Sequence, residues 1–514
     1  MPTYLSPGVY VEETSAGARP IEGVGTAVAA FVGLASAGPY NTPTLVTNWS
    51  QFTKIFGDFV EGTYLHHSVY GYFQNGGGAC YIVRVGGNGA SAPVARAELT
   101  AAAGGGGAAA NVGAFRVQAL SEGAEGNDIT VEIADSAAEG APEDAFKLIV
   151  KKGDKVEETF DNVTTKKGRQ NVVNVVNAQS KLVRLEDLGV SAEKVSRGTV
   201  ALAGGGVPAP THLAPDDYVG DAADRTGFGG LEAIDEVTMV SVPDLMSAYQ
   251  NGMLDAEGVK AVQLAMIAHC ELMGDRMAIL DPPPGLNAQQ IKEWRVDKAG
   301  YDSKYAALYW PWVKVMDPAT GTNVFVPPSG HMAGIWGRND DTRGVHKAPA
   351  NEVVRGAISL EINITKNEHD LLNPVGINCI RAFPGRGIRV WGARTISSDP
   401  AWRYLNVRRL FNYLEESILN GTDWVVFEPN DYSLWSKINR TISTFLVNEW
   451  RKGALFGLTP AEAFYVKCDA ETNPAEGIDA GQVVCEIGVA PVKPAEFVIF
   501  RLSQFSGGAA LVNE

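Results

Sequence analysis

The 514-residue chain is short of cysteine and of positive charge. Its five cysteines form no C-x-x-C pair and are odd in number, which favours neither a structural zinc site nor a disulfide framework. Lysine and arginine total 43 against 59 aspartate and glutamate residues, so the net charge is −16. This balance argues against a nucleic-acid binder and against binding to anionic membranes, because both need clustered positive charge. We expect reduced thiols at Cys80, Cys270, Cys379, Cys468 and Cys485.

Long hydrophobic runs are lacking too. No apolar stretch reaches the roughly 18 residues of a membrane-spanning helix. The opening MPTYLSPGVYVEE has neither the basic nor the apolar region of a signal peptide. Hydrophobic residues still make up 45% of the chain, which is typical of a folded protein. The sequence therefore predicts about three domains, synthesis in the cytoplasm and no insertion into a membrane.

Most signatures of catalysis are missing as well. The chain has no G-x-x-x-x-G-K-[ST], H-E-x-x-H, G-x-S-x-G or EF-hand pattern. Asp244 and Asp281 each follow an expected parallel strand, where α/β enzymes place catalytic groups. The prolines beside them favour ordinary turns instead. A hydrolase that uses one of these aspartates stays as an alternative.

Two clusters contain histidine. His66 and His67 are adjacent on a short expected helix, so their side chains point to different sides and do not suit a shared metal. Glu368, His369 and Asp370 could suggest acid–base work, but a solvated helix face explains them better. We therefore expect no catalytic residue, no cofactor and no metal site.

Two glycine-rich stretches, 86–107 and 204–206, divide the chain. The residues between them alternate apolar and polar side chains at 115–120 and 128–135, and 147–152 is also rich in strand formers. Residues 122–158 carry four lysines against eleven acidic residues. We expect residues 108–205 to form an acidic, β-rich inserted domain.

Residues 210–355 alternate strand and helix patterns. Strands are expected at 237–242, 277–280 and 305–310. A helix that ends at Gly274 lies between the first two, and another begins near Asn287. This β-α-β-α-β order predicts a middle domain with a parallel α/β sheet.

The last 120 residues read as two long helices and several strands. The first helix follows the N-cap Asp399 and ends at Gly421, and the second ends at Gly453. A capping box is expected at 459–462. Strands are expected at 425–427, 483–489 and 496–502.

Both ends of the chain are apolar and interrupted by proline. Such segments should not stay as open strands, so each pairs either within its own subunit or with a neighbour's sheet. Pairing with a neighbour is the interpretation we favour. The residues we assign to these arms are Tyr4, Leu5, Val9, Tyr10, Val11, Phe497, Val498, Ile499, Phe500 and Leu502.

Long segments carry a family resemblance over about 1–86 and 235–505. They include YLSPGVYVEE, FVGLASAGPYNTPTLVTNWSQFTKIFGDF, GYFQNGGGACYIVRV, RMAILDPPPG, YAALYWPW, VPPSGHMAGIWGRND, TRGVHKAPAN and LLNPVGINCIRAFPGRGIRVWGARTISSDPAWRYLNVRRL. These segments resemble the contractile tail sheath proteins of phages and phage-tail-like injection particles. Residues 110–205 do not share in the resemblance.

The resemblance implies a structural subunit and no enzyme. Sheath subunits of this family form a helical array around an inner tube in an extended, metastable state. The array contracts after the baseplate is triggered and drives the tube into a target. The implied partners are copies of the chain itself, the inner tube protein, and baseplate and tail-terminator proteins. A static tube or lattice protein is the alternative from another class.

The expected fold class is a multidomain α+β and α/β chain. Residues 1–86 and 356–514 would form a discontinuous sheath core domain with terminal strand arms, 210–355 the middle α/β domain, and 108–205 the insert. Residues 381–452 carry eleven basic against seven acidic residues. Internal ion pairs are the ordinary explanation of this pattern. The hypothesis set against it is that part of this region and a helix near 366–373 face the tube. The candidates are Lys366, Glu368, His369, Asp370, Arg403, Arg408 and Arg409.

Overall fold

The computed structural model describes residues 20–86, 96–100, 113–120, 124–138, 140–142, 144–153, 155–188, 195–202 and 213–501. All structural statements below concern these residues. Some of the predicted arm residues lie outside them, namely Tyr4, Leu5, Val9, Tyr10, Val11 and Leu502.

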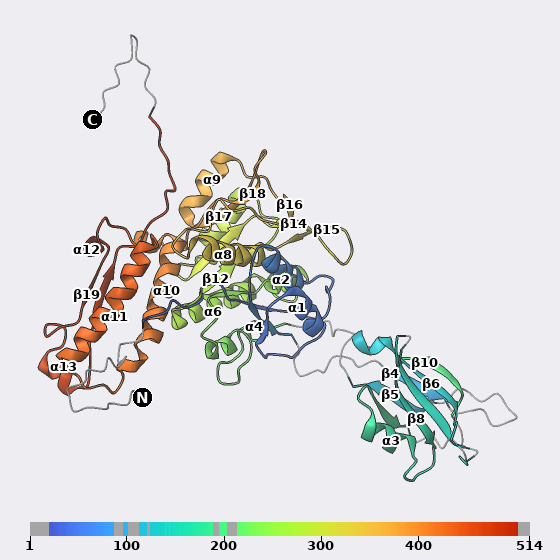
Figure 1. Cartoon of the computed structure of the whole chain (residues 1–514). Helices are drawn as coiled ribbons and strands as arrows, with labels where there is room; N and C mark the ends of the chain where they lie inside the picture. Colours follow the sequence, from blue (N-terminus) through green and yellow to red (C-terminus); the bar gives the residue numbers. More distant parts are fainter. Residues whose placement is uncertain are drawn as a thin grey trace, which may run out of the picture.

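An eight-stranded sheet forms the centre of the largest unit (Figure 1). Its strands run in the order β18 (Gly387–Val390), β17 (Ile377–Phe383), β13 (Ala306–Trp310), β12 (Met277–Leu280), β11 (Met239–Ser241), β1 (Ala29–Gly33), β3 (Cys80–Arg84) and β2 (Thr44–Val46). The two edge strands are antiparallel to their neighbours, and the six inner strands are parallel. The parallel α/β prediction is thus confirmed.

Helices cover both faces of this sheet, which explains why its strands are almost entirely apolar. One face packs against α1 (Trp49–Phe56), α2 (Leu65–Gln74) and α8 (Ser329–Arg343). The other packs against α4 (Pro215–Val219), α5 (Asp244–Gln250), α6 (Ala256–Met273) and α7 (Ala288–Glu293), which a π-helical turn (Trp294–Ala299) continues. Helix α6 begins at its N-cap Asp255 and ends at Gly274, whose φ of 73° suits glycine.

A small antiparallel sheet lies beside the large one. Its order is β15 (Asn323–Val326), β14 (Val313–Met316) and β16 (Ala357–Leu360). After β16, the short helix α9 (Lys366–Leu372) leads back into β17 of the large sheet. Leu372 is fully buried in the core under this helix, so α9 has a fixed position on the unit.

The C-terminal unit has a core of its own. Helices α10 (Leu405–Thr422) and α11 (Tyr432–Arg451) are antiparallel, and the hairpin of β19 (Phe464–Lys467) and β20 (Glu486–Val489) packs on α11. Two short helices complete it, α12 (Pro460–Ala463) and α13 (Ala475–Asp479). The apolar stripes at helical spacing predicted both long helices. The start of the first was misplaced, because Asp399 caps the 3₁₀ turn Pro400–Trp402 and α10 begins only at Leu405.

The insert also has a core of its own, built only from residues 115–202. One sheet has the order β10 (Gly198–Ala201), β6 (Ile129–Asp135), β7 (Phe146–Lys152) and β8 (Lys155–Val163). The other has β4 (Arg96–Thr100), β5 (Gly113–Ala119) and β9 (Val183–Asp187), and helix α3 (Val172–Gln179) packs on it. Figure 1 shows the insert apart from the rest of the described chain. The predicted β-rich character is confirmed, but the insert begins before the predicted residue 108, because β4 pairs with β5.

The division between core and middle domains differs from the prediction. Strands β1–β3 and β17–β18, assigned to the core domain, hydrogen-bond with the middle-domain strands β11 and β13 in one sheet. Residues 20–86 and 213–396 therefore form one α/β unit, and the helical unit begins near residue 397. Sequence patterns mark strands but not their partners, which is why the boundary was misplaced.

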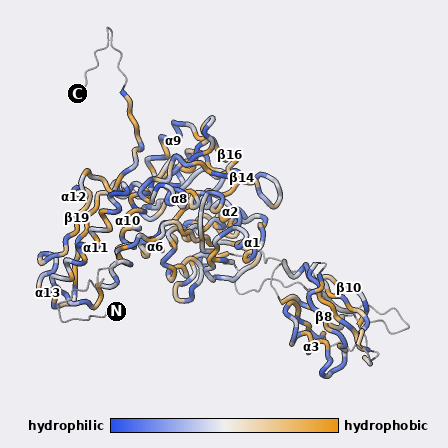
Figure 2. Tube along the Cα trace, viewed as in Figure 1, coloured by the Kyte–Doolittle hydropathy of each residue, from blue (hydrophilic) through white to orange (hydrophobic). Residues whose placement is uncertain are grey.

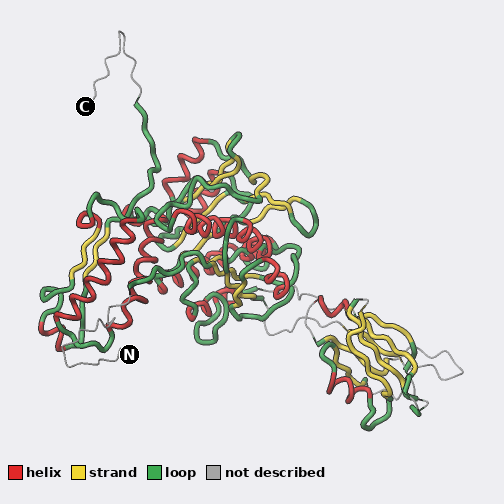
Figure 3. The backbone as a smooth tube through the Cα atoms, in the orientation of Figure 1, coloured by secondary structure: helices red, strands yellow, loops and turns green. Residues whose placement is uncertain are grey.

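Three local predictions also fail. Residues 423–425 form a 3₁₀ turn rather than the start of a strand. The capping box at 459–462 does not form, because the Thr459 side chain makes no cap hydrogen bond. Residues 496–501 form no strand with the described part of the chain (Figure 3). No helix of the described residues is long and apolar enough to cross a membrane.

Candidate assembly surface at the base of the C-terminal arm

The arm, which we define as residues 493–501, leaves the molecule between the two units. Just before it, Ala490 and Val492 are tied to the C-terminal unit: Phe456 N donates to Ala490 O at 2.8 Å and Val492 N to Ala454 O at 3.3 Å. Asn406 Nδ2 at the start of α10 also donates to Val492 O at 3.1 Å. The arm therefore starts from a fixed point.

Glu496 then crosses to the α/β unit. Arg394 Nε donates to Glu496 Oε1 at 2.8 Å and Arg394 Nη2 to Glu496 Oε2 at 2.5 Å, so the ion pair is bidentate. Asn373 Nδ2 donates to the same Oε1 at 3.1 Å, and Arg394 Nη1 to Asn373 O at 3.1 Å. We call Asn373, Arg394 and Glu496 the arm clamp.

Beyond the clamp, four apolar side chains in a row are exposed. The exposed fractions are 74% for Phe497, 66% for Val498, 79% for Ile499 and 84% for Phe500. Figure 2 shows this hydrophobic stretch as the segment that runs away from the body toward the C-terminus. Nothing in the described chain covers it. A run of this kind is a template for strand pairing with another chain.

A groove of about 900 Å³ opens beside the arm. Helix α9, strand β17, the end of α8 and the arm itself line it. Its lining has an excess of cations over carboxylates, and aromatic rings lie among them. The cations are Arg343, Lys347, Lys366, Arg381 and Lys493, the carboxylates Asp370 and Glu496, and the rings Phe383, Trp391 and Tyr404.

Three of the predicted tube-facing residues come together in this groove: Lys366, His369 and Asp370. Their helix is set by a capping box, in which Glu368 N donates to Thr365 Oγ1 at 3.3 Å and Thr365 N to Glu368 Oε2 at 2.8 Å. Glu368 therefore serves the helix N-terminus. Burial, followed by the charge of Arg381, holds the pKa of His369 below its usual value.

The other predicted cations behave differently. Arg409 is 4% exposed, and its guanidinium forms a bidentate pair with Asp340 at 2.9 and 2.5 Å. Arg408 is 2% exposed, and its Nε donates to Asn412 Oδ1 at 2.7 Å. Arg408 Nη2 also pairs with Glu415 Oε1 at 3.2 Å. Both arginines are therefore buried and engaged in internal ion pairs, which agrees with the ordinary explanation of the charge pattern. Arg403 is half-buried.

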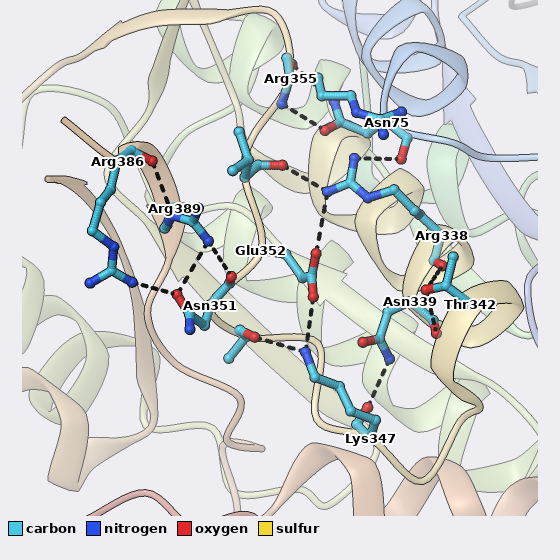
Figure 4. A network of polar contacts seen from close by, with 12 residues as sticks. Asn75, Arg338, Asn339, Thr342, Lys347, Asn351, Glu352, Arg355, Arg386 and Arg389 are labelled. Carbon is cyan, nitrogen blue, oxygen red and sulfur yellow. Dashed lines mark hydrogen bonds and ion pairs between the residues drawn. The ribbon is translucent and has the colours of Figure 1, made fainter.

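A polar network (Figure 4) fixes the loop of residues 344–355, and part of this loop, within residues 346–351, lines the groove. Arg389 Nη1 donates to Asn351 O at 2.7 Å, and Lys347 Nζ pairs with Glu352 Oε1 at 3.0 Å. On the other side, Arg338 Nη2 donates to Val353 O at 2.7 Å. These bonds tie the loop to β18 and α8, so the groove is a preformed surface.

The β19–β20 hairpin is a second candidate surface. It is a two-stranded sheet in the described chain, and such a hairpin is marginally stable alone. Phe464, Val466, Ile487 and Val489 pack toward the C-terminal core. The Tyr465 ring lies over Gly488 on the outer face and is 59% exposed. No strand of the described residues occupies the outer edge of β20.

The two aspartates weighed as catalytic groups are buried and support the fold. Asp244 accepts hydrogen bonds from the backbone N atoms of Leu34 (2.6 Å) and Leu65 (3.3 Å), and burial raises its pKa to about 6. Asp281 accepts from Ser329 N (3.0 Å) and Oγ (2.5 Å), and burial raises its pKa to about 7. A role in a local turn was expected for both. Instead, each aspartate side chain joins the end of a strand to backbone N–H groups that are distant in the sequence.

The described histidines and cysteines lie in several separate places. Among the described residues, no group of three or more His, Cys, Asp or Glu could hold a metal ion. His66 lies against Phe52, while His67 lies 3.7 Å from Asp317, so the two rings do point to different sides. All five cysteines are free thiols, and four of them are buried.

Sequence reasoning missed the arm clamp. Glu496 is the last charge before an apolar run, but Arg394 lies 102 residues earlier in the chain. No local pattern links them. Only the fold, which returns the arm to the segment after β18, brings the pair together.

Two family models match the chain. The model described as "Phage tail sheath protein central domain" matches residues 231–396, and "Phage tail sheath C-terminal domain" matches residues 397–505. The matched region, 231–505, is more than half of the 514 residues. The boundary between the models coincides with the boundary between the α/β unit and the helical unit.

Curated relatives include tail sheath proteins. That of Burkholderia phage BcepMu is 24% identical over 96% of this chain and 95% of its own length. That of Vibrio phage KVP40 is 27% identical over 43% of this chain, and a putative prophage major tail sheath protein of Pseudomonas aeruginosa is 26% identical over 44%. The chain spans only 34% and 57% of these two relatives' lengths.

Solved structures share the fold. One is the sheath complex of an extracellular contractile injection system, PVC, in its contracted state. It matches with a TM-score of 0.59 and 22% sequence identity, and the match covers 98% of this chain and 99% of that chain. The contracted helical sheath of the anti-feeding prophage has a TM-score of 0.58 and 24% identity over 98% and 100%. A crystal structure of a sheath tail protein from Desulfitobacterium hafniense has a TM-score of 0.60 and 14% identity over 90% and 94%.

Proposed function

Because the chain belongs to the phage tail sheath family, we propose that it is the repeating subunit of a contractile sheath. Many copies assemble helically around an inner tube in an extended, metastable state. Contraction then drives the tube into a target, in a phage tail or a phage-tail-like particle. The partners are other copies, the tube, and baseplate and terminator proteins. The subunit carries out no catalysis of its own.

The observation that carries this proposal is the exposed apolar run Phe497–Phe500. A single soluble subunit would gain nothing from four consecutive exposed apolar side chains, because they favour aggregation. In an array they become useful, since an extended arm can add to the sheet of the next subunit. Proline at 494 and the clamp at 496 limit the length of the strand that is offered.

The β19–β20 hairpin is the acceptor we propose. Its free strand edge offers unpaired backbone groups, and its exposed Tyr465 offers apolar surface. Each backbone hydrogen bond that an arm adds contributes roughly 0.5–1.5 kcal/mol net. Burial of Phe497 and Phe500 adds about 1.5–3 kcal/mol for each ring. A link of this kind can survive while the subunits rotate.

The N-terminal arm would work in the same way. Residues Tyr4–Val11 lie outside the described residues, so this prediction rests on their sequence, YLSPGVYV. It is apolar, and Pro7, which lacks an N–H group, limits the length of strand that can pair. Two arms per subunit would link each copy to more than one neighbour.

The tube contact we propose is the groove beside the arm. Lys366, His369 and Asp370 line it, and Arg403 lies nearby on the segment before α10. Its surplus of cations suits an acidic tube surface. Contacts of this polar kind are weaker in water than apolar ones and are screened by salt, so the sheath can release the tube during contraction.

Replacing Phe497 and Phe500 by serine tests the strand-exchange proposal. Both side chains are exposed, so the variant should fold and remain soluble, yet its polymerisation should fall at least tenfold. The matched control is Leu272→Ser, which removes an equally exposed apolar side chain on α6, outside the arm. Sheath formation is measured by sedimentation and electron microscopy.

A chain without residues 1–13 tests the other arm. It should also stay soluble, folded and unable to polymerise. Sheaths of normal length that contract from either variant alone would contradict strand exchange.

A further inference from the structure

We infer that the arm clamp positions the C-terminal arm for donation, so that Arg394 and Glu496 decide how well a subunit donates its arm while leaving its capacity to accept one unchanged. This inference rests on the proposed function, because it concerns the strand exchange proposed there. It assigns a role to residues that lie outside the exposed run Phe497–Phe500 and outside the β19–β20 hairpin.

The geometry of the clamp makes it a fixed joint. A bidentate pair holds Glu496 in two directions at once, and Asn373 adds a third contact to the same carboxylate. Arg394 is itself anchored through its backbone: its N donates to Asn378 Oδ1 at 2.7 Å, and its O accepts from Asn378 Nδ2 at 2.8 Å. Asn378 lies on β17, so the arm is tied to the eight-stranded sheet.

The burial and charge around the clamp keep it closed. The exposed fractions of the side chains are 9% for Arg394 and 20% for Glu496, so water competes little for their hydrogen bonds. Burial alone would raise the pKa of Glu496, but hydrogen bonds from Arg394 and Asn373 outweigh it and lower the pKa. The charges of Arg394 and Arg403 also lower the pKa of Glu496, so its carboxylate stays ionised between two guanidinium groups.

The position of the clamp in the chain gives it its effect. Ala490 and Val492 are bound to the C-terminal unit, Glu496 to the α/β unit, and the exposed residues begin at the next position. The clamp is thus the last fixed point before the donated segment. Without the clamp, residues 493–501 would be more flexible, so pairing with a neighbour would cost more conformational entropy. The freed arm could also fold back against the groove beside it instead of reaching a neighbour.

The test separates donation from acceptance. The acceptor is the full-length chain with Val498→Pro and Phe500→Pro, which cannot donate a strand because proline lacks the N–H and breaks pairing. It is immobilised, and capture of soluble full-length donors is measured by surface plasmon resonance. The donors are the unaltered chain, Glu496→Gln and Arg394→Lys. A fourth donor that carries both prolines measures the capture that comes from the N-terminal arms alone, and this baseline is subtracted from the other three. Lysine keeps the positive charge but cannot form the bidentate hydrogen bonds that arginine forms with a carboxylate.

We expect the proline acceptor to capture the unaltered chain and to bind Glu496→Gln about tenfold more weakly, with Arg394→Lys weakened in the same direction. The control donor, Glu471→Gln, breaks the exposed pair with Lys467 in the same unit and should bind normally. In the reverse arrangement, an acceptor that carries Glu496→Gln and both prolines should capture the unaltered chain with normal affinity.

Each other outcome counts against the clamp. Equal capture of Glu496→Gln and the unaltered chain would remove its positioning role. If Glu496→Gln weakened binding equally as donor and as acceptor, the clamp would only stabilise the fold and would not position the arm. If the proline acceptor fails to capture even the unaltered chain, the proposed strand donation by this arm is wrong. The inference about the clamp is then wrong as well.

Discussion

Replacing Arg409 by methionine should destabilise the subunit strongly, although the sequence suggested a tube-facing side chain. The Arg409 guanidinium and the Asp340 carboxylate are each 3% exposed and form two hydrogen bonds, at 2.9 and 2.5 Å. Arg409 Nη2 also donates to Thr26 O at 3.0 Å, and the guanidinium lies over the Trp336 ring, 4.8 Å from its centre. The pair joins α10 of the helical unit to α8 of the α/β unit.

The magnitude follows from what methionine leaves behind. Asp340 would keep only the hydrogen bond from Thr26 Oγ1 at 2.6 Å, in a place that water barely reaches. Removing one partner of a buried ion pair typically costs about 3–5 kcal/mol. With a urea slope of about 3 kcal/mol/M, the unfolding midpoint should fall by about 1 M or more. A second change, Asp340→Leu, should restore much of this loss, because no buried charge then stays unpaired.

The assay is urea unfolding followed by tryptophan fluorescence. The control is Lys467→Met, which breaks an exposed pair that should contribute no more than about 1 kcal/mol. If Arg409 faced the tube, its variant would unfold like the unaltered chain and fail only in tube binding. A midpoint within about 0.2 M of the unaltered chain would therefore refute the reasoning.

Three further predictions concern the insert, a buried acid and the groove. Deleting residues 96–203 with a short Gly-Ser join should leave sheath assembly intact in micrographs, because the described strands of the insert lie within residues 96–201 and its core within 115–202; loss of all assembly would contradict this. The folded pKa of Asp281, about 7, lies above its ordinary value, so its contribution to stability is complete below about pH 4 and is lost as pH rises through 7. Asp281→Asn should flatten this slope, by up to about 1.4 kcal/mol per pH unit, in unfolding curves measured from pH 4 to 8. Lys366→Glu, on the exposed end of α9, should weaken binding to the tube protein at least several-fold in co-sedimentation while empty sheaths still form, and unchanged tube binding would remove the groove from the proposed contact.

The sequence predicted those elements whose signals are local. Helix α6 was readable because its apolar spacing ends at a glycine that adopts the left-handed conformation. Strands β12 and β13 were readable as short, wholly apolar runs. Residues 425–427 were wrongly predicted to be a strand because two valines and a phenylalanine also form a short apolar run. Phe427 is instead fully exposed at the turn after α10, with a φ of 67°.

Long-range pairings could not be predicted in this way. That β1 lies between β11 and β3 is decided by packing across about 200 residues of sequence. The charge pattern did not reveal whether Arg403, Arg408 and Arg409 are surface or interior side chains, because arginine is common in both settings. For the arm, the apolar run was evident from the sequence. The clamp that fixes its direction could be recognised only from the folded structure.

Cryo-electron microscopy of the native particle before and after triggering tests the contractile sheath most directly. We expect two helical states with different lengths and diameters. In both, residues 497–500 of one subunit should extend the β19–β20 sheet of another as an added strand. One fixed tube length, or an arm that pairs only within its own subunit in either state, would contradict it.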